Sequence, residues 1–141
     1  MTFDLATARS VLAAKFAPWI VELGIDVAEI DRGGAAVLRM PAGAKIARDG
    51  GVVCGQASMA LADTAMVFAI SAASGGYRPM TTVSQISTFI RPLAGAEVFA
   101  RARLLKLGRT LAFGEVILAA EIGGEPAVQV SSTYAILGPV A

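Results

Sequence analysis

The stretch VVCGQASMALADTAMVFAISAA, residues 52–73, is a long apolar segment that predicts the central element of the fold. It is rich in Ala, Met and Leu, which favour helix, and it is apolar nearly all round, as is typical of a helix buried on most of its faces. It is a candidate membrane span, but it carries Gln56 and Asp63, and a carboxylate near the centre of a lone transmembrane helix costs several kcal/mol. The segment therefore predicts the core helix of a folded domain, around which a sheet is expected to wrap.

The residues before this helix predict a second, shorter helix and a hairpin. Residues 5–18 have apolar side chains at helical spacing and predict an amphipathic helix that ends at Pro18. Residues 25–40 predict two strands with a turn at Gly33 and Gly34.

The residues after the long helix predict four more strands, at 80–90, 97–105, 110–122 and 127–137. The breaks between them, at 92–95, 106–109 and 123–126, are short enough to join antiparallel neighbours. The order of elements predicts an α+β fold, an antiparallel meander curled around the long helix, with residues 1–141 as a single domain.

The balance of apolar and charged residues bears on assembly. Hydrophobic residues make up 55% of the chain and charged residues only 16%, and the mean hydropathy is +0.65. Such a surplus suits an oligomer, in which part of each subunit's surface becomes interior. We therefore expect a homodimer or a homotetramer.

Charge, cysteine content and the N-terminus exclude several classes of function. A net charge of +1 gives no broad positive field, so neither nucleic acid nor a membrane is an expected partner. A single cysteine rules out an internal disulfide framework, and without Cys/His pairs no metal is expected. The first ten residues, MTFDLATARS, do not resemble a signal peptide, so a cytoplasmic location is expected.

Asp63 is the side chain that indicates chemistry. Between Gly50 and Tyr77 it is the only side chain normally charged at neutral pH, and it lies in the middle of the apolar helix. An unpaired carboxylate among apolar groups is costly, so it normally has a partner or faces a wet cleft where it is used. Two interpretations stay open: a structural ion pair with Arg78 or Arg48, and a catalytic carboxylate.

The chain contains no histidine, which removes Ser-His-Asp and Cys-His hydrolases and His-dependent dehydratases. A carboxylate can attack a reactive acyl centre or activate a water against it, provided that N–H groups stabilise the developing oxyanion. Gly55, at the predicted start of the helix, offers unpaired N–H groups and close approach, although it could equally be an ordinary helix-start glycine. Thioesters suit such a site.

Three motifs resemble one known family. Residues 54–65, CGQASMALADTA, resemble the signature of hot-dog-fold acyl-CoA thioesterases of the phenylacetate-degradation (PaaI-like) type, which is HGG, four residues, then LxD. Residues 82–92, TVSQISTFIRP, resemble the strand that follows in that family, and residues 107–113, LGRTLAF, resemble its GRxLAF hairpin. The resemblance covers roughly residues 50–137 and implies the hot-dog fold, an antiparallel sheet wrapped around a long central helix.

The resemblance also implies catalytic roles. Asp63, supplied from the other subunit of a dimer, would be the nucleophile or general base, and Gly55 would donate the oxyanion-hole N–H. The Ser or Thr that holds the water maps to Thr82, with Thr81 as the competing register and an ordinary strand threonine as the other interpretation. No metal or redox cofactor is implied, because CoA is part of the substrate.

The sequence departs from the family at three positions: Cys54 replaces the histidine, Gln56 replaces the second glycine, and Arg48 stands at an upstream asparagine position. Cys54 and Gln56 would lie at the substrate site. Cys54 is expected to be a small buried residue rather than a nucleophile, since no histidine activates it. Gln56 could turn its amide towards the thioester carbonyl, or serve as a local cap or subunit contact.

Basic residues near strand ends could bind the phosphates of CoA. Arg91, Lys106 and Arg109 are candidates, and the family tends to carry basic residues at the positions of Arg91 and Arg109; solvated charges are the alternative. Arg101 and Arg103 alternate with apolar residues and are expected on an exposed strand face.

The sequence thus predicts an acyl-CoA thioesterase that uses Asp63 and no metal to release a carboxylic acid and CoA. The alternative is a non-catalytic hot-dog module that binds acyl-CoA, which the replacements at Cys54 and Gln56 make credible. A purely structural oligomerisation domain ranks last, and the acyl group stays open.

Overall fold

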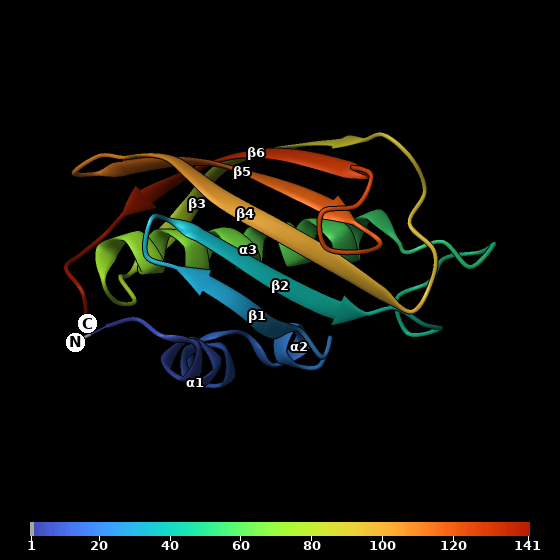
Figure 1. Cartoon of the computed structure of the whole chain (residues 1–141), viewed down its shortest axis with the longest axis horizontal. Helices are drawn as coiled ribbons and strands as arrows, with labels where there is room; N and C mark the ends of the chain where they lie inside the picture. The colour runs from blue at the N-terminus through green and yellow to red at the C-terminus, as the bar shows by residue number, and fades with distance from the viewer. Residues whose placement is uncertain (1) are drawn as a thin grey trace.

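The computed structural model describes residues 2–141, which form a sheet with a long helix across one face (Figure 1). The elements in chain order are α1 (Leu5–Lys15), α2 (Pro18–Val21), β1 (Asp26–Asp31), β2 (Ala35–Pro41), α3 (Gly55–Ser74), β3 (Met80–Phe89), β4 (Glu97–Leu107), β5 (Leu111–Ala119) and β6 (Val128–Ile136). In this part of the chain, six antiparallel strands form one sheet in the order β1-β2-β4-β5-β6-β3. The predicted α+β hot-dog architecture is confirmed.

The position of β3 differs from the predicted meander. Residues 92–95 do not join antiparallel neighbours: β3 pairs with β6 at one edge of the sheet, whereas β4 pairs with β2. The connection is held at the start of α3, where the Val53 N–H donates to the Leu93 carbonyl at 2.9 Å. Among residues 2–141, no strand covers the outer side of β3, which is an edge strand.

Helix α3 begins at Gly55 rather than at Val52. Residues 52–54 are extended because Val53 forms a bridge with Ala47 and the Cys54 N–H donates to the Ile46 carbonyl at 2.8 Å. The helix ends at Ser74, followed by Gly75 in the left-handed conformation (φ 77°) that glycine adopts without strain.

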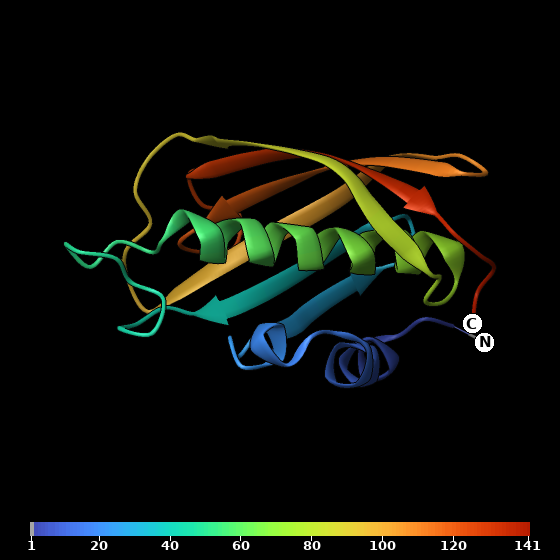
Figure 2. The same cartoon turned by 180° about the vertical axis from the view of Figure 1, so that it is seen from behind.

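The sheet buries most of α3, as predicted. Twelve of the 20 residues in the helix are buried, and Figure 2 shows the helix lying across the sheet. Met66 packs so closely on Gly114 of β5 that a Cβ there would come within 2.1 Å of Met66 Cε. The helix is long and apolar enough to cross a membrane, but 67% of an 18-residue apolar segment within it is buried inside the fold.

Helix α1 packs against the edge strand β1, and the residues that flank α1 contact α3. Asp4 caps α1 by accepting the Thr7 N–H at 2.8 Å. Pro18 begins the short helix α2, which the sequence did not predict; a proline is accepted there because the first helical N–H needs no acceptor. Phe16 stacks on Phe68 of α3 with ring centroids 5.6 Å apart, which fixes this layer to the core.

Candidate active site

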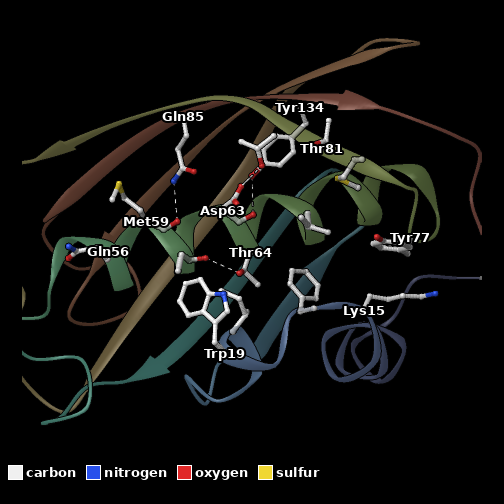
Figure 3. Close-up of a pocket in the computed structure, with 16 residues that line it drawn as sticks. Lys15, Trp19, Gln56, Met59, Asp63, Thr64, Tyr77, Thr81, Gln85 and Tyr134 are labelled. Atoms are coloured by element: carbon white, nitrogen blue, oxygen red, sulfur yellow. Dashed lines mark hydrogen bonds between the residues drawn. The ribbon is translucent and has the colours of Figure 1, made fainter.

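Asp63 lies near the middle of α3 and faces a cleft of about 420 Å³ (Figure 3). Its carboxylate is held on one side only. Oδ1 accepts hydrogen bonds from the Thr82 hydroxyl at 2.8 Å and from the Tyr134 hydroxyl. Within residues 2–141, Oδ2 accepts no hydrogen bond. The carboxylate therefore presents one free oxygen to a cleft of the size that small-molecule sites have.

The pairing of β3 with β6 produces this arrangement. Thr82 and Tyr134 are directly opposite each other in the two strands, so their side chains extend from the same face towards α3. A bulge between Thr82 and Ser84 shifts the alternation of β3, and Gln85 then reaches α3 as well, where its Nε2 donates to the Met59 carbonyl at 3.1 Å.

The ion-pair interpretation of Asp63 is wrong. Arg78 Nε donates instead to the Gly138 carbonyl at 2.9 Å, and the Arg48 guanidinium contacts the Asp49 carbonyl at 3.3 Å. In the described residues neither arginine pairs with Asp63. The partners of the carboxylate are neutral hydroxyls, and burial, followed by the nearby charge of Asp63, raises the pKa of Tyr134 so that it stays protonated.

The other walls of the cleft come from residues that the sequence did not single out. The N-terminal helices and their junction contribute Lys15, Phe16, Trp19 and Ile20. Tyr134 and Gln85 come from the sheet. Strand alternation would have placed Tyr134 on an inner face, but its contact with Asp63 depends on which strands pair, and local sequence does not give that pairing.

Gly55, the first residue of α3, lines a second pocket of about 450 Å³ with Ser58, Phe89, Arg48 and Arg91. Its N–H has no acceptor among residues 2–141. The chain between it and Asp63 is helical, so eight residues at about 1.5 Å each separate the two by about 12 Å. One chain therefore does not bring Gly55 and Asp63 onto the same reacting carbon, which must lie about 3 Å from both groups.

The remaining candidates fall into two groups. Gln56, Thr81 and Thr82 line the Asp63 cleft, and Thr82 rather than Thr81 contacts the carboxylate. Cys54 is half-buried, packs against the core and lines neither pocket.

The predicted basic residues lie at two ends of the sheet. Arg91 lines the Gly55 pocket and pairs with Glu125 at 3.1 Å. Arg109 is exposed in the turn between β4 and β5, at the other end of the sheet, and Lys106 is exposed nearby on β4; neither lines either pocket. Arg101 and Arg103 are exposed on β4, as predicted. Residues 2–141 hold no group of three or more His, Cys, Asp or Glu side chains able to bind a metal ion.

Known proteins share both the sequence pattern and the fold. The model of the thioesterase superfamily matches residues 50–127. No curated protein matches the chain. Similar solved structures include a conserved protein, PA5202, of Pseudomonas aeruginosa, at 28% identity and a TM-score of 0.82 over 92% of this chain and 99% of that one. The phenylacetic acid degradation protein PaaI of Thermus thermophilus, in a mutant form, is 27% identical, with a TM-score of 0.74 over 86% of this chain and 100% of its own. Thioesterase HI1161 of Haemophilus influenzae shares the fold, with a TM-score of 0.85 at 20% identity, over 100% of this chain and 95% of its own.

Proposed function

Because the chain belongs to the thioesterase superfamily, we propose that it hydrolyses acyl-CoA thioesters with Asp63 as its catalytic carboxylate and without a metal ion. Membership of the family makes the chain a thioester hydrolase. One observation carries the role of Asp63: its carboxylate opens into a cleft with Oδ1 held by two hydroxyls and Oδ2 free.

The free oxygen is placed to do the chemistry. Oδ2 takes a proton from a water whose oxygen attacks the thioester carbonyl carbon, or it attacks that carbon itself and water then hydrolyses the acyl-enzyme. In either route the C–S bond breaks, the CoA sulfur leaves with a proton as a thiol, and the acyl group leaves as a carboxylic acid. The Thr82 hydroxyl donates to Asp63 and keeps lone pairs that can accept a hydrogen bond from that water.

The oxyanion site requires a second copy of the chain. Gly55 has a free N–H at the positive end of α3, which suits a developing negative charge. It lies about 12 Å along the helix from Asp63 of its own chain, so the Gly55 that serves a given Asp63 must belong to another subunit.

Strand β3 has the features of the dimer interface. It is an edge strand, and it exposes Val83, Ile86 and Phe89 with 59%, 67% and 52% of their surface accessible. An apolar edge of this kind is suited to pairing with another strand. Antiparallel pairing about a two-fold axis near Gln85 and Ile86 would put Thr82, beside Asp63, opposite Phe89 of the partner subunit. In each chain Phe89 lies against Gly55, so this pairing joins the two pockets.

A site built from the Asp63 cleft of one subunit and the Gly55 pocket of the other also gives roles to residues that differ from the family and to the basic residues. Gln56 lines the cleft of Asp63 and can direct its amide to the thioester carbonyl or to the partner. Arg91 and Arg48 line the Gly55 pocket, where their guanidinium groups can bind CoA phosphates. Arg109 lines neither pocket, because it lies in the turn between β4 and β5 at the end of the sheet opposite the Gly55 pocket; it could contact a CoA phosphate only there.

A thiol-release assay with short, medium and aryl acyl-CoAs tests the proposal. Asp63→Asn keeps the shape of the side chain but removes its basicity, so kcat/KM should fall about a thousandfold. The matched control is Asp31→Asn, an exposed aspartate at the end of β1 that is expected to leave activity unchanged. Unchanged hydrolysis by Asp63→Asn would contradict the assignment of Asp63 as the catalytic carboxylate.

A further inference from the structure

Tyr134 is the one residue that contacts the Asp63 carboxylate and that neither the family motifs nor the sequence pattern indicates, within the part of the chain that the structure describes. Its side chain is almost completely buried in β6, with 1% of its surface exposed. Yet its hydroxyl contacts Asp63 at two atoms: it donates to Oδ1, and it lies 3.0 Å from the main-chain carbonyl oxygen. Figure 3 shows the ring directed from the sheet towards Asp63.

We propose that Tyr134 is a positioning residue that, with Thr82, fixes Oδ1 of Asp63 so that Oδ2 alone faces the substrate. This inference rests on the proposed function of Asp63 and extends it. A carboxylate on a free Cβ–Cγ bond exchanges its two oxygens by rotation. Two donors on one oxygen, from adjacent positions of paired strands, oppose that rotation and set the direction of the lone pairs on the other.

The geometry fits positioning better than packing alone. A phenyl ring would fill the same space, so the hydroxyl has to be explained by its partners, and buried hydroxyls are nearly always hydrogen-bonded. Both of its contacts lie on Asp63, and the main-chain contact ties the tyrosine to the helix itself. Burial and the charge of Asp63 raise the pKa of Tyr134, so the hydroxyl stays a donor when the enzyme works.

Strand β6 supplies a matched control. Ser132 lies two residues before Tyr134, and its hydroxyl is also buried, but within residues 2–141 it has no hydrogen-bond partner. Ser132→Ala therefore removes a buried hydroxyl from the same strand without touching Asp63.

The test measures kcat, KM and the unfolding midpoint for wild type, Tyr134→Phe, Thr82→Val, the double variant and Ser132→Ala, with a short-chain acyl-CoA. The loss of a hydrogen bond to a charged group that acts in the transition state lowers the rate by about tenfold or more. Tyr134→Phe should therefore lower kcat by about that factor, while KM stays within about twofold. Because both hydroxyls act on one carboxylate, the double variant should lose less than the product of the single losses. Ser132→Ala should keep the wild-type kcat.

Three results would overturn the proposal. The first is a wild-type kcat in folded Tyr134→Phe; the second is an equal loss of kcat in Ser132→Ala; the third is independent, multiplicative losses in the double variant. Asp63→Asn, measured in parallel, distinguishes failure of this inference from failure of the proposed function. If Asp63→Asn is inactive and Tyr134→Phe is fully active, only the positioning role of Tyr134 is contradicted. If Asp63→Asn is active, the catalytic role of Asp63 is contradicted as well.

A spectroscopic readout covers the case in which Tyr134→Phe does not fold. The chain contains only two tyrosines, so fluorotyrosine labelling gives two ¹⁹F signals, which Tyr77→Phe assigns. The Tyr134 signal should shift when Asp63 is replaced by asparagine and should not shift in Asp31→Asn. No shift in Asp63→Asn would contradict the contact.

Discussion

At the scale of single residues, Tyr134 couples the candidate active site to the stability of the fold. Burial and the charge of Asp63 raise its pKa in the folded chain, whereas a tyrosine in an unfolded chain ionises at about pH 10. Above that pH the unfolded state binds fewer protons than the folded state, so the free energy of unfolding falls as pH rises. Below it, Tyr134 is protonated in both states and adds no pH dependence.

Urea unfolding at several pH values checks this. Between about pH 10 and pH 11.5, the free energy of unfolding of wild type should fall by up to about 1.4 kcal/mol per pH unit more than that of Tyr134→Phe, because the variant has no phenol at this position to ionise. Equal slopes for the two proteins in this range would mean that Tyr134 ionises as readily folded as unfolded, contrary to its burial.

The residues of the site differ in how far sequence could predict them. Asp63 and Gly55 stand out locally, one as a lone carboxylate in an apolar helix and the other as the glycine at its start. The motif favours Thr82 over Thr81, and the structure gives Thr82 the contact with Asp63. Tyr134 is 71 residues from Asp63, and only the β3–β6 pairing brings them together, so no local pattern could identify it.

At the scale of elements, α1 and α2 form a wall of the cleft and bear on which acyl groups bind. Trp19, the residue after Pro18 at the start of α2, lines the cleft with 58% of its surface exposed. Covering roughly 55 Å² of that ring by an acyl group, at about 25 cal/mol per Å², stabilises the complex by about 1.4 kcal/mol, or about tenfold in affinity.

Trp19→Ala should therefore raise KM for aryl and medium-chain acyl-CoAs about tenfold, with kcat within about twofold and no loss of thermal stability. Val21→Ala is the control, because Val21 is exposed on the same helix but does not line the cleft. A KM for Trp19→Ala equal to that of wild type with every acyl chain would show that the acyl group binds elsewhere.

Elements were predictable where the pattern is local and repeated. Periodicity placed α3 and all six of the strands within residues 2–141, because each buries one face or most of its surface. The apolar stretch by itself does not set the start of α3, since residues 52–54 are as apolar as the helix and are extended through bonds to Ile46 and Leu93; only Gly55 indicates the start. The expected helix end at Pro18 is wrong: α1 ends at Lys15, and Pro18 is the first residue of α2, a position that proline favours, so the pattern does not indicate α2.

At the scale of the whole molecule, the position of β3 determines how the site can be completed. Sequence predicted the strand but placed it beside β4, whereas the observed pairing with β6 makes it an edge. That edge carries residues of both pockets, Thr82 and Gln85 at the Asp63 cleft and Phe89 at the Gly55 pocket. Long-range pairing, which no short window of sequence reveals, thus places residues of both pockets on one edge strand.

If the two pockets are half-sites that a dimer completes, as proposed, two inactive variants should complement each other. Asp63→Asn removes the carboxylate, and Gly55→Ala adds a Cβ 3.3 Å from the Phe89 ring, where it should block approach to the N–H. Gly43→Ala is the control, because a Cβ there meets nothing within 4 Å.

When the two variants are unfolded together, mixed and refolded, about half of the dimers should be mixed. Each mixed dimer pairs the intact Gly55 of one chain with the intact Asp63 of the other, while its second site carries both defects. About one quarter of the wild-type activity should therefore return. Adding Ile86→Lys to both chains puts charges on the β3 edge and should abolish the recovery, with the chains monomeric in sedimentation. If the mixture stays inactive although mixed dimers form, Gly55 and Asp63 act within one chain, and the helix between them would have to bend or unwind to let them meet.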